Sequence, residues 1–192
     1  MAFLIIGLVL FLGIHSTRIF ADGWRGAQIA RLGEKRWKGL YTLVSLIGFA
    51  LIVWGYGQAR QSPVVLWPSP LWTRHLTGLL VLIAFVLLAA ANGPANHIKE
   101  KLGHPMLAGT KLWAFAHLLA NGTLADAVLF GSFLLWAALC FRSSRRRDRA
   151  AGVRYPAGTL RGDVSSVVGG AAVWAVFAFW LHGVLIGVRP FG

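Results

Sequence analysis

Six long apolar segments, separated by short polar stretches, constrain this chain more than any other feature of its sequence. They lie at 2–20, 40–58, 76–91, 105–121, 124–141 and 165–188. A helix needs about 20 mostly apolar residues to cross the core of a bilayer, and these segments have lengths near that value. Only 13% of the residues are charged, about half the ~25% of an ordinary soluble domain. We therefore predict an all-α fold: a polytopic membrane helical bundle of about six transmembrane helices, forming one transmembrane domain over 1–192.

The basic residues give the chain a formal net charge of +13, and their distribution predicts its orientation. If the N-terminus lies outside, the inner segments are a basic loop at 18–38, a stretch at 95–111 that begins with a polar turn at 95–103, and a run at 142–161. These three segments hold 16 of the 19 Lys and Arg residues. Because basic residues concentrate in cytoplasmic loops, the partition predicts six spans with both termini outside. No nucleic-acid-binding motif accompanies the charge, so the expected partner is the lipid bilayer and not nucleic acid.

The fourth and fifth apolar segments are expected to form a tight hairpin. Asn121-Gly122 is a strong turn signal. Thr123 and Asp126 have the spacing of a capping box, which would start the next helix immediately after the turn. The alternative is one continuous helix over 105–141, which would be ~55 Å long at ~1.5 Å per residue and too long for a ~30 Å apolar core.

Two of the six histidines, His15 and His117, lie within apolar segments. An imidazole inside a bilayer is costly without a partner, and no Asp or Glu lies in the middle of any predicted span. The remaining partners are a backbone carbonyl, a hydroxyl, a trapped water or a metal, for which neutral imidazole is a common ligand. Two histidines on different helices suit the axial ligation of a haem, whereas a zinc or copper site would lack further carboxylate or thiolate ligands. The chain has no CxxCH motif, which excludes covalent c-type attachment.

The other four histidines and the single cysteine give weaker indications of function. His104 precedes Pro105, a residue suited to the first turn of a helix, so we expect His104 to cap the fourth helix and keep it as a possible secondary ligand. Cys140 ends an apolar segment and is expected to be a buried thiol. No special role is expected of the histidines near helix ends or in the polar turn, which are His75, His97 and His182.

The segment His104–Ala137, which reads HPMLAGTKLWAFAHLLANGTLADAVLFGSFLLWA, resembles the NnrU family of bacterial membrane proteins. That family is linked to denitrification and nitrogen-oxide metabolism, and it is similar to the 15-cis-zeta-carotene isomerase, a haem b membrane enzyme. In the isomerase a His-Pro pair starts the corresponding helix and a haem-ligating histidine follows thirteen residues later, the interval from His104 to His117 here. Its second ligand is followed by Ser, as His15 is by Ser16. The resemblance therefore implies a protein of the bacterial inner (cytoplasmic) membrane in which His15 and His117 hold haem b.

One departure from the isomerase bears on activity. The isomerase has a cysteine three residues before the ligand that corresponds to His117, implicated as an alternate ligand, and the corresponding residue here is Ala114. A His-to-Cys ligand switch is therefore absent from this chain, which argues against the isomerase reaction. Three functions stay open: a haem b protein supporting nitrite or nitric oxide reduction, together with other membrane redox proteins; a redox-dependent cis–trans isomerase of a carotenoid or other isoprenoid; and a non-catalytic membrane assembly factor.

The expected depths of the two histidines do not match. His117 lies about twelve residues from the inner start of its helix, which is ~18 Å at ~1.5 Å per residue. His15 lies only ~5–8 Å from the inner end of a helix that stops near Arg18–Phe20. The difference of about 10 Å is an obstacle to placing both imidazoles on one iron, since the axial ligands of a haem approach it from opposite faces at the same point.

The topology is open to a direct test with reporter fusions. We expect alkaline phosphatase fused after Arg147 to be inactive, because the basic run should hold that site on the inner side. The same enzyme fused after the last apolar segment should be active. Activity of the fusion after Arg147 would contradict six spans with both termini outside.

Overall fold

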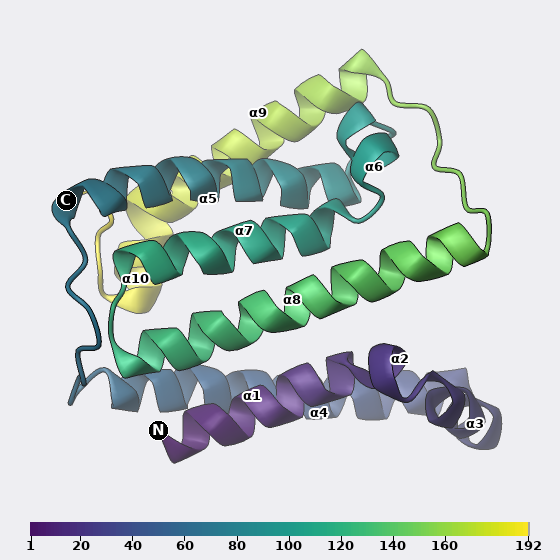
Figure 1. Cartoon of the computed structure of the whole chain (residues 1–192), viewed down its shortest axis with the longest axis horizontal. Coiled ribbons are helices and arrows are strands. Elements are labelled where there is room, and N and C mark those ends of the chain that lie inside the picture. The colour runs from purple at the N-terminus through teal and green to yellow at the C-terminus, as the bar shows by residue number, and fades with distance from the viewer. Residues whose placement is uncertain (192) are drawn as a thin grey trace.

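A computed structural model shows an all-α protein and describes residues 1–191. Figure 1 shows the long helices packed side by side in a bundle, and an isolated β-bridge joins Val65 and Thr123. Their bounds are α1 Ala2–His15, α2 Thr17–Phe20, α3 Asp22–Leu32, α4 Glu34–Ala59, α5 Leu71–Asn92, α6 His97–Leu102, α7 Pro105–Ala120, α8 Leu124–Ala150, α9 Leu160–Val176, the π-helical turn η1 Phe177–Leu181 and α10 His182–Ile186.

Four helices among the described residues are long and apolar enough to cross a membrane. They are α4, α5, α8 and the continuous stretch Leu160–Ile186 that joins α9, η1 and α10. Helix α1 is a shorter apolar helix of 14 residues, ~21 Å at ~1.5 Å per residue. Helix α7 has 16 residues and lies alongside α5 and α8 in the same bundle (Figure 1). The structure thus confirms an all-α, multi-pass helical membrane protein, but it has four candidate spans and a shorter N-terminal apolar helix where the sequence predicted about six spans.

The bundle consists of two groups of helices joined by α8. Helix α1 packs along α4, while α5 packs against both α7 and α9. Helix α8 packs extensively on α7 and touches α1 and α4 through fewer contacts, so it lies between the two groups (Figure 1). The buried cluster follows this arrangement, because it combines residues of α1, α4, α7 and α8. Helix α8 therefore contacts both groups and joins them.

Glycines allow α1 and α4 to approach closely. A Cβ added at Gly55 would lie 2.2 Å from the backbone nitrogen of Leu4, and one at Gly7 would lie 2.6 Å from that of Ile52. Small residues commonly bring membrane helices together in this way, because dispersion contacts replace the hydrophobic effect inside lipid. The same principle operates at Gly109, where an added Cβ would lie 2.9 Å from the carbonyl oxygen of Ala84 and would separate α7 from α5.

The hairpin expected between the fourth and fifth segments is confirmed. Helix α7 ends at Ala120 and α8 begins at Leu124, with Thr123 and Asp126 forming both hydrogen bonds of a capping box. The turn is fixed from outside as well, because the backbone N–H of Leu124 donates to the carbonyl of Val64 in the preceding loop.

Several segments expected to be loops are helical. The basic loop at 18–38 forms most of α2, α3 and the start of α4, and the polar turn at 95–103 contains α6. Helix α8 extends from the expected end at 141 to Ala150, because Arg and Ala favour helices and carry the chain beyond its apolar part. Helix α6 forms where Asn96 caps it by accepting from the N–H of Lys99. The last helix begins at Leu160 instead of 165 and includes the π-helical turn.

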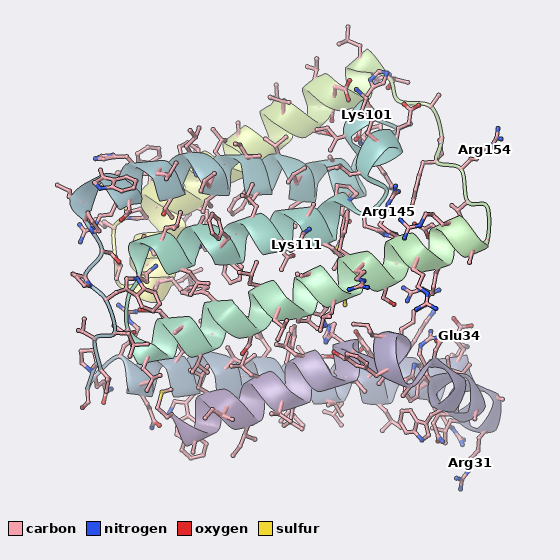
Figure 2. All side chains as sticks on the ribbon, viewed as in Figure 1. Arg31, Glu34, Lys101, Lys111, Arg145 and Arg154 are labelled. Carbon is pink, nitrogen blue, oxygen red and sulfur yellow. The ribbon has the colours of Figure 1, made fainter. Side chains whose placement is uncertain are left out.

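Charged side chains gather at one end of the bundle. Figure 2 shows Arg31, Lys101, Arg145 and Arg154 at the end that holds α3, α6 and the last turns of α8. The start of α1 and helix α10 lie toward the opposite end in Figure 1.

The glycine contacts predict a matched pair of variants. Gly55→Ala should destabilise the protein, because its methyl group would collide with the backbone of α1; overpacking of this kind costs about 1–3 kcal/mol. Gly57→Ala, on the same helix, meets nothing within 4 Å and should be neutral or slightly stabilising. Thermal unfolding in detergent, followed by tryptophan fluorescence, measures both. Equal midpoints for the two variants would contradict the close packing of α1 on α4.

Candidate functional site

His15 is the last residue of α1 and is surrounded by aromatic rings. Its Nδ1 lies 2.6 Å from the carbonyl oxygen of Phe11, one turn earlier. Its ring centroid is 4.3 Å from that of Phe11, 5.1 Å from that of Tyr41 on α4 and 6.0 Å from that of Trp136 on α8. The partner that sequence analysis left open is therefore a backbone carbonyl at one nitrogen and aromatic surface around the rest of the ring.

His117 lies in the last turn of α7 and has the same local arrangement. Its Nδ1 is 2.8 Å from the carbonyl oxygen of Trp113, again one turn earlier. The imidazole stacks on Phe130 of α8 at 4.7 Å between centroids with an interplanar angle of 28°, and the Trp113 ring lies 5.1 Å away. Its own carbonyl accepts from the backbone N–H and side-chain amide of Asn121, which ends the helix.

The structure does not bring the two imidazoles together. His117 contacts Phe130 and His15 contacts Trp136, two residues six positions apart on α8. That separation corresponds to ~9 Å along the helix at ~1.5 Å per residue, close to the depth difference expected from the sequence. Helix α1 runs antiparallel to α7, with each histidine near the C-terminal end of its helix (Figure 1).

Phe133 occupies the middle of the space between the two histidines. Its ring centroid is 5.9 Å from that of Phe11 on α1 and 5.8 Å from that of Trp113 on α7. Since Phe11 contacts His15 and Trp113 contacts His117, a continuous row of aromatic rings joins the two imidazoles. The pair as placed therefore does not suit two-sided ligation of one iron.

Each histidine taken singly has the donor chemistry of a metal ligand. An Nδ1–H that donates to a carbonyl fixes the tautomer and leaves Nε2 with its lone pair, the usual arrangement of a ligating histidine. Among residues 1–191, no group of three or more His, Cys, Asp or Glu side chains converges to hold a bare metal ion. A single imidazole suits a metal whose other ligands come from its own macrocycle, as in haem. Ala114, one turn before His117, is fully buried among apolar residues.

His104 does not act as expected. It stands at the N-cap position of α7, but its side chain makes no capping hydrogen bond. Its Nε2 instead lies 2.7 Å from a carboxylate oxygen of Asp148 at the far end of α8, and the hydroxyl of Tyr155 donates to the same oxygen. Burial and the neighbouring carboxylate raise the pKa of Tyr155, so its hydroxyl keeps its proton. The capping hypothesis was wrong, because a carboxylate brought close by the α7–α8 packing competes for the imidazole.

A buried carboxylate near His117 completes the polar groups of this region. Asp126 is 5% exposed, and its Oδ1 accepts from the hydroxyl of Tyr56 at 2.5 Å. Its Oδ2 accepts from the backbone N–H and hydroxyl of Thr123. The spacing of Thr123 and Asp126 predicts the capping box, but no local pattern signals Tyr56, a partner seventy residues away on α4.

The remaining histidines have separate roles. His97 was expected to have none, yet its ring and backbone N–H both bond to Asp163, which ties α6 to α9. His182 bonds through Nδ1 to the carbonyl of Val188, and His75 is exposed. Cys140 is buried on α8, as expected.

An apolar pocket of about 250 Å³ lies between α5, α7 and α8. It is near the aromatic row, because Trp113 and Phe133 belong to both, and Thr110 supplies a hydroxyl at its wall. The other lining residues are Ala84, Phe85 and Leu88. A pocket of this composition suits an apolar group such as a hydrocarbon chain.

The Tyr56–Asp126 contact predicts a second matched pair. Tyr56→Phe removes a donor from a buried carboxylate, which should lower stability by about 1–3 kcal/mol. Tyr41→Phe is the control on the same helix, since the Tyr41 hydroxyl donates no hydrogen bond among the described residues 1–191. Thermal unfolding in detergent should show a clearly lower midpoint for Tyr56→Phe alone. Equal losses in both variants would mean that the Asp126 hydrogen bond contributes nothing.

Comparisons with known proteins identify the family. The family model described as NnrU protein matches residues 3–190, nearly the whole chain. No match was found among curated proteins or solved structures. The chain belongs to the NnrU family, and the match extends across the two groups of helices described above.

Proposed function

We propose that this NnrU-family membrane protein binds haem b through His117 and supports nitrogen-oxide metabolism, such as nitrite or nitric oxide reduction. The observation that carries the proposal is the arrangement of the His117 imidazole, with Nδ1 bonded to the carbonyl of Trp113 and the ring stacked on Phe130. The hydrogen bond orients the ring and increases its basicity at Nε2, the nitrogen available to iron.

The proposal assigns His117 as the ligand and leaves His15 off the same iron. His15 has equivalent donor chemistry, but Phe11 and Phe133 lie between it and the α7 side of the site. Joining both imidazoles to one iron would require α1 to move along α8, against its glycine-mediated packing on α4. The two-histidine arrangement implied by the family resemblance is therefore the alternative form of this proposal.

A haem with one protein ligand supplies an open coordination position at which a small molecule such as nitric oxide can bind. The residues of this chain would contribute an apolar and aromatic surrounding, made by Trp113, Phe130 and Phe133. Reduction of a nitrogen oxide also needs electrons from elsewhere, so the proposal includes another membrane redox protein as partner.

The second candidate, a cis–trans isomerase of a carotenoid or other isoprenoid, is favoured by the apolar pocket between α5, α7 and α8. Its volume of about 250 Å³ is enough for part of such a chain and not for the whole. The buried Ala114 in place of a cysteine argues against the ligand exchange of the related isomerase. A non-catalytic assembly factor is the third candidate, and the absence of haem from well-folded protein would favour it.

The absorption spectrum of purified, haem-supplied protein tests the proposal. We expect a b-type Soret band that His117→Ala abolishes and that His15→Ala leaves in place. His75→Ala, a change at an exposed histidine, is the control and should match the wild type. Folding is checked separately by thermal unfolding of each variant.

Three results would contradict the assignment. A well-folded, haem-supplied protein without a Soret band would show that the protein does not bind haem. An unchanged spectrum in His117→Ala would assign the iron to another ligand, and loss of the band in both histidine variants would favour the two-histidine form.

A further inference from the structure

A pocket of about 470 Å³ at the charged end of the bundle is separate from the histidines of the proposed haem site. It lies between α6, the last turns of α8 and the linker to α9 (Figure 2). Four basic side chains line it, which are Lys101, Arg145, Arg149 and Arg154. We call it the basic pocket and propose that it binds the phosphate group of an anionic molecule at the membrane surface.

The basic side chains of the pocket are available to a ligand. None of them forms an ion pair with a carboxylate within 4 Å in the part of the chain that the structure describes. They come from three separate segments, so the fold and not the local sequence brings their charges together. Arginine binds phosphate well because its planar guanidinium presents paired N–H donors to two oxygens.

The two carboxylates at the pocket are already occupied. Glu100 accepts from the backbone N–H of Gly158 at 2.6 Å. Asp148 accepts from His104 and Tyr155. Glu100 therefore fixes the linker, and Asp148 fixes the linker and the start of α7. Four cationic side chains and only two anionic ones line the pocket.

The C-terminal end of α8 does not oppose an anion as strongly as a bare helix end would. A helix C-terminus carries partial negative charge on its unpaired carbonyls. Here the carbonyls of Arg147, Asp148 and Arg149 accept from backbone N–H groups of the residues that follow, which are Ala151, Val153 and Gly152. Their lone pairs are thus partly used within the chain.

The position of the pocket suits a phosphate held at a lipid surface. The apolar part of α8 reaches about Phe141, and the pocket begins at Arg145, one turn further along. Basic pockets at the ends of membrane helices recognise anionic headgroups in this way. A soluble phosphate has the same chemistry, so the experiment must separate a lipid headgroup from the free ion.

The test uses the full-length protein in nanodiscs of phosphatidylcholine. Its thermal midpoint is measured with added phosphatidylglycerol in the disc, and separately with inorganic phosphate in the buffer, since a ligand that binds the folded state raises the midpoint. We expect a rise of several degrees with at least one of them. A rise with phosphatidylglycerol alone identifies a lipid headgroup, a rise with inorganic phosphate alone identifies the free ion, and a rise with both identifies a phosphate site open to either source.

Variants assign that rise to the pocket. Arg145→Gln combined with Arg149→Gln should lose more than half of it. Lys101→Gln combined with Arg154→Gln changes two exposed side chains, should also lose more than half, and keeps the test decisive if the first pair folds poorly. Arg31→Gln combined with Arg36→Gln removes the same charge from exposed positions outside the pocket and should keep the full rise. No rise in the wild type, or equal loss in the control, would overturn the proposal.

Discussion

The contacts of Phe133 with Phe11 on one side and Trp113 on the other hold this bundle together at its centre. Helix α8 carries Phe133 and is the element that joins the α1–α4 pair to the α5–α7–α9 group. Backbone contacts between α8 and α1 are sparse, so large side chains fill the space and supply the attraction. Dispersion between packed rings has to do this work, because burial from water gives no advantage inside lipid.

The same row of rings separates the two half-buried histidines in space, although their local arrangements are comparable. Each sits near the end of an apolar helix and bonds to the carbonyl one turn back. Helices α1 and α7 run in opposite directions. Two histidines that both lie near the C-terminal ends of their helices therefore lie at different depths in the bundle. In the proposed arrangement the His117 imidazole is available to an iron, and a row of aromatic rings separates it from the His15 imidazole.

Local patterns predicted much of the fold. Hydrophobic length located the apolar helices, and the Asn121-Gly122 turn with Thr123 and Asp126 predicted the α7–α8 hairpin that the structure confirms. The helical nature of 22–32 and 97–102 was missed, because charged and polar composition was interpreted as loop. Of the candidate site, the residue types were visible in the sequence, but the partners were not. Asp148 for His104 and Tyr56 for Asp126 come from distant segments, and only packing brings them together.

The number of protein ligands on the proposed haem is the central claim, and electron paramagnetic resonance of the ferric, haem-supplied protein tests it most directly. One imidazole leaves ferric haem high-spin, whereas two give a low-spin centre. The account predicts an axial high-spin signal that changes when nitric oxide is added. A low-spin signal typical of two imidazoles, lost in both His15→Ala and His117→Ala, would contradict it and would mean that α1 shifts along α8 when haem binds.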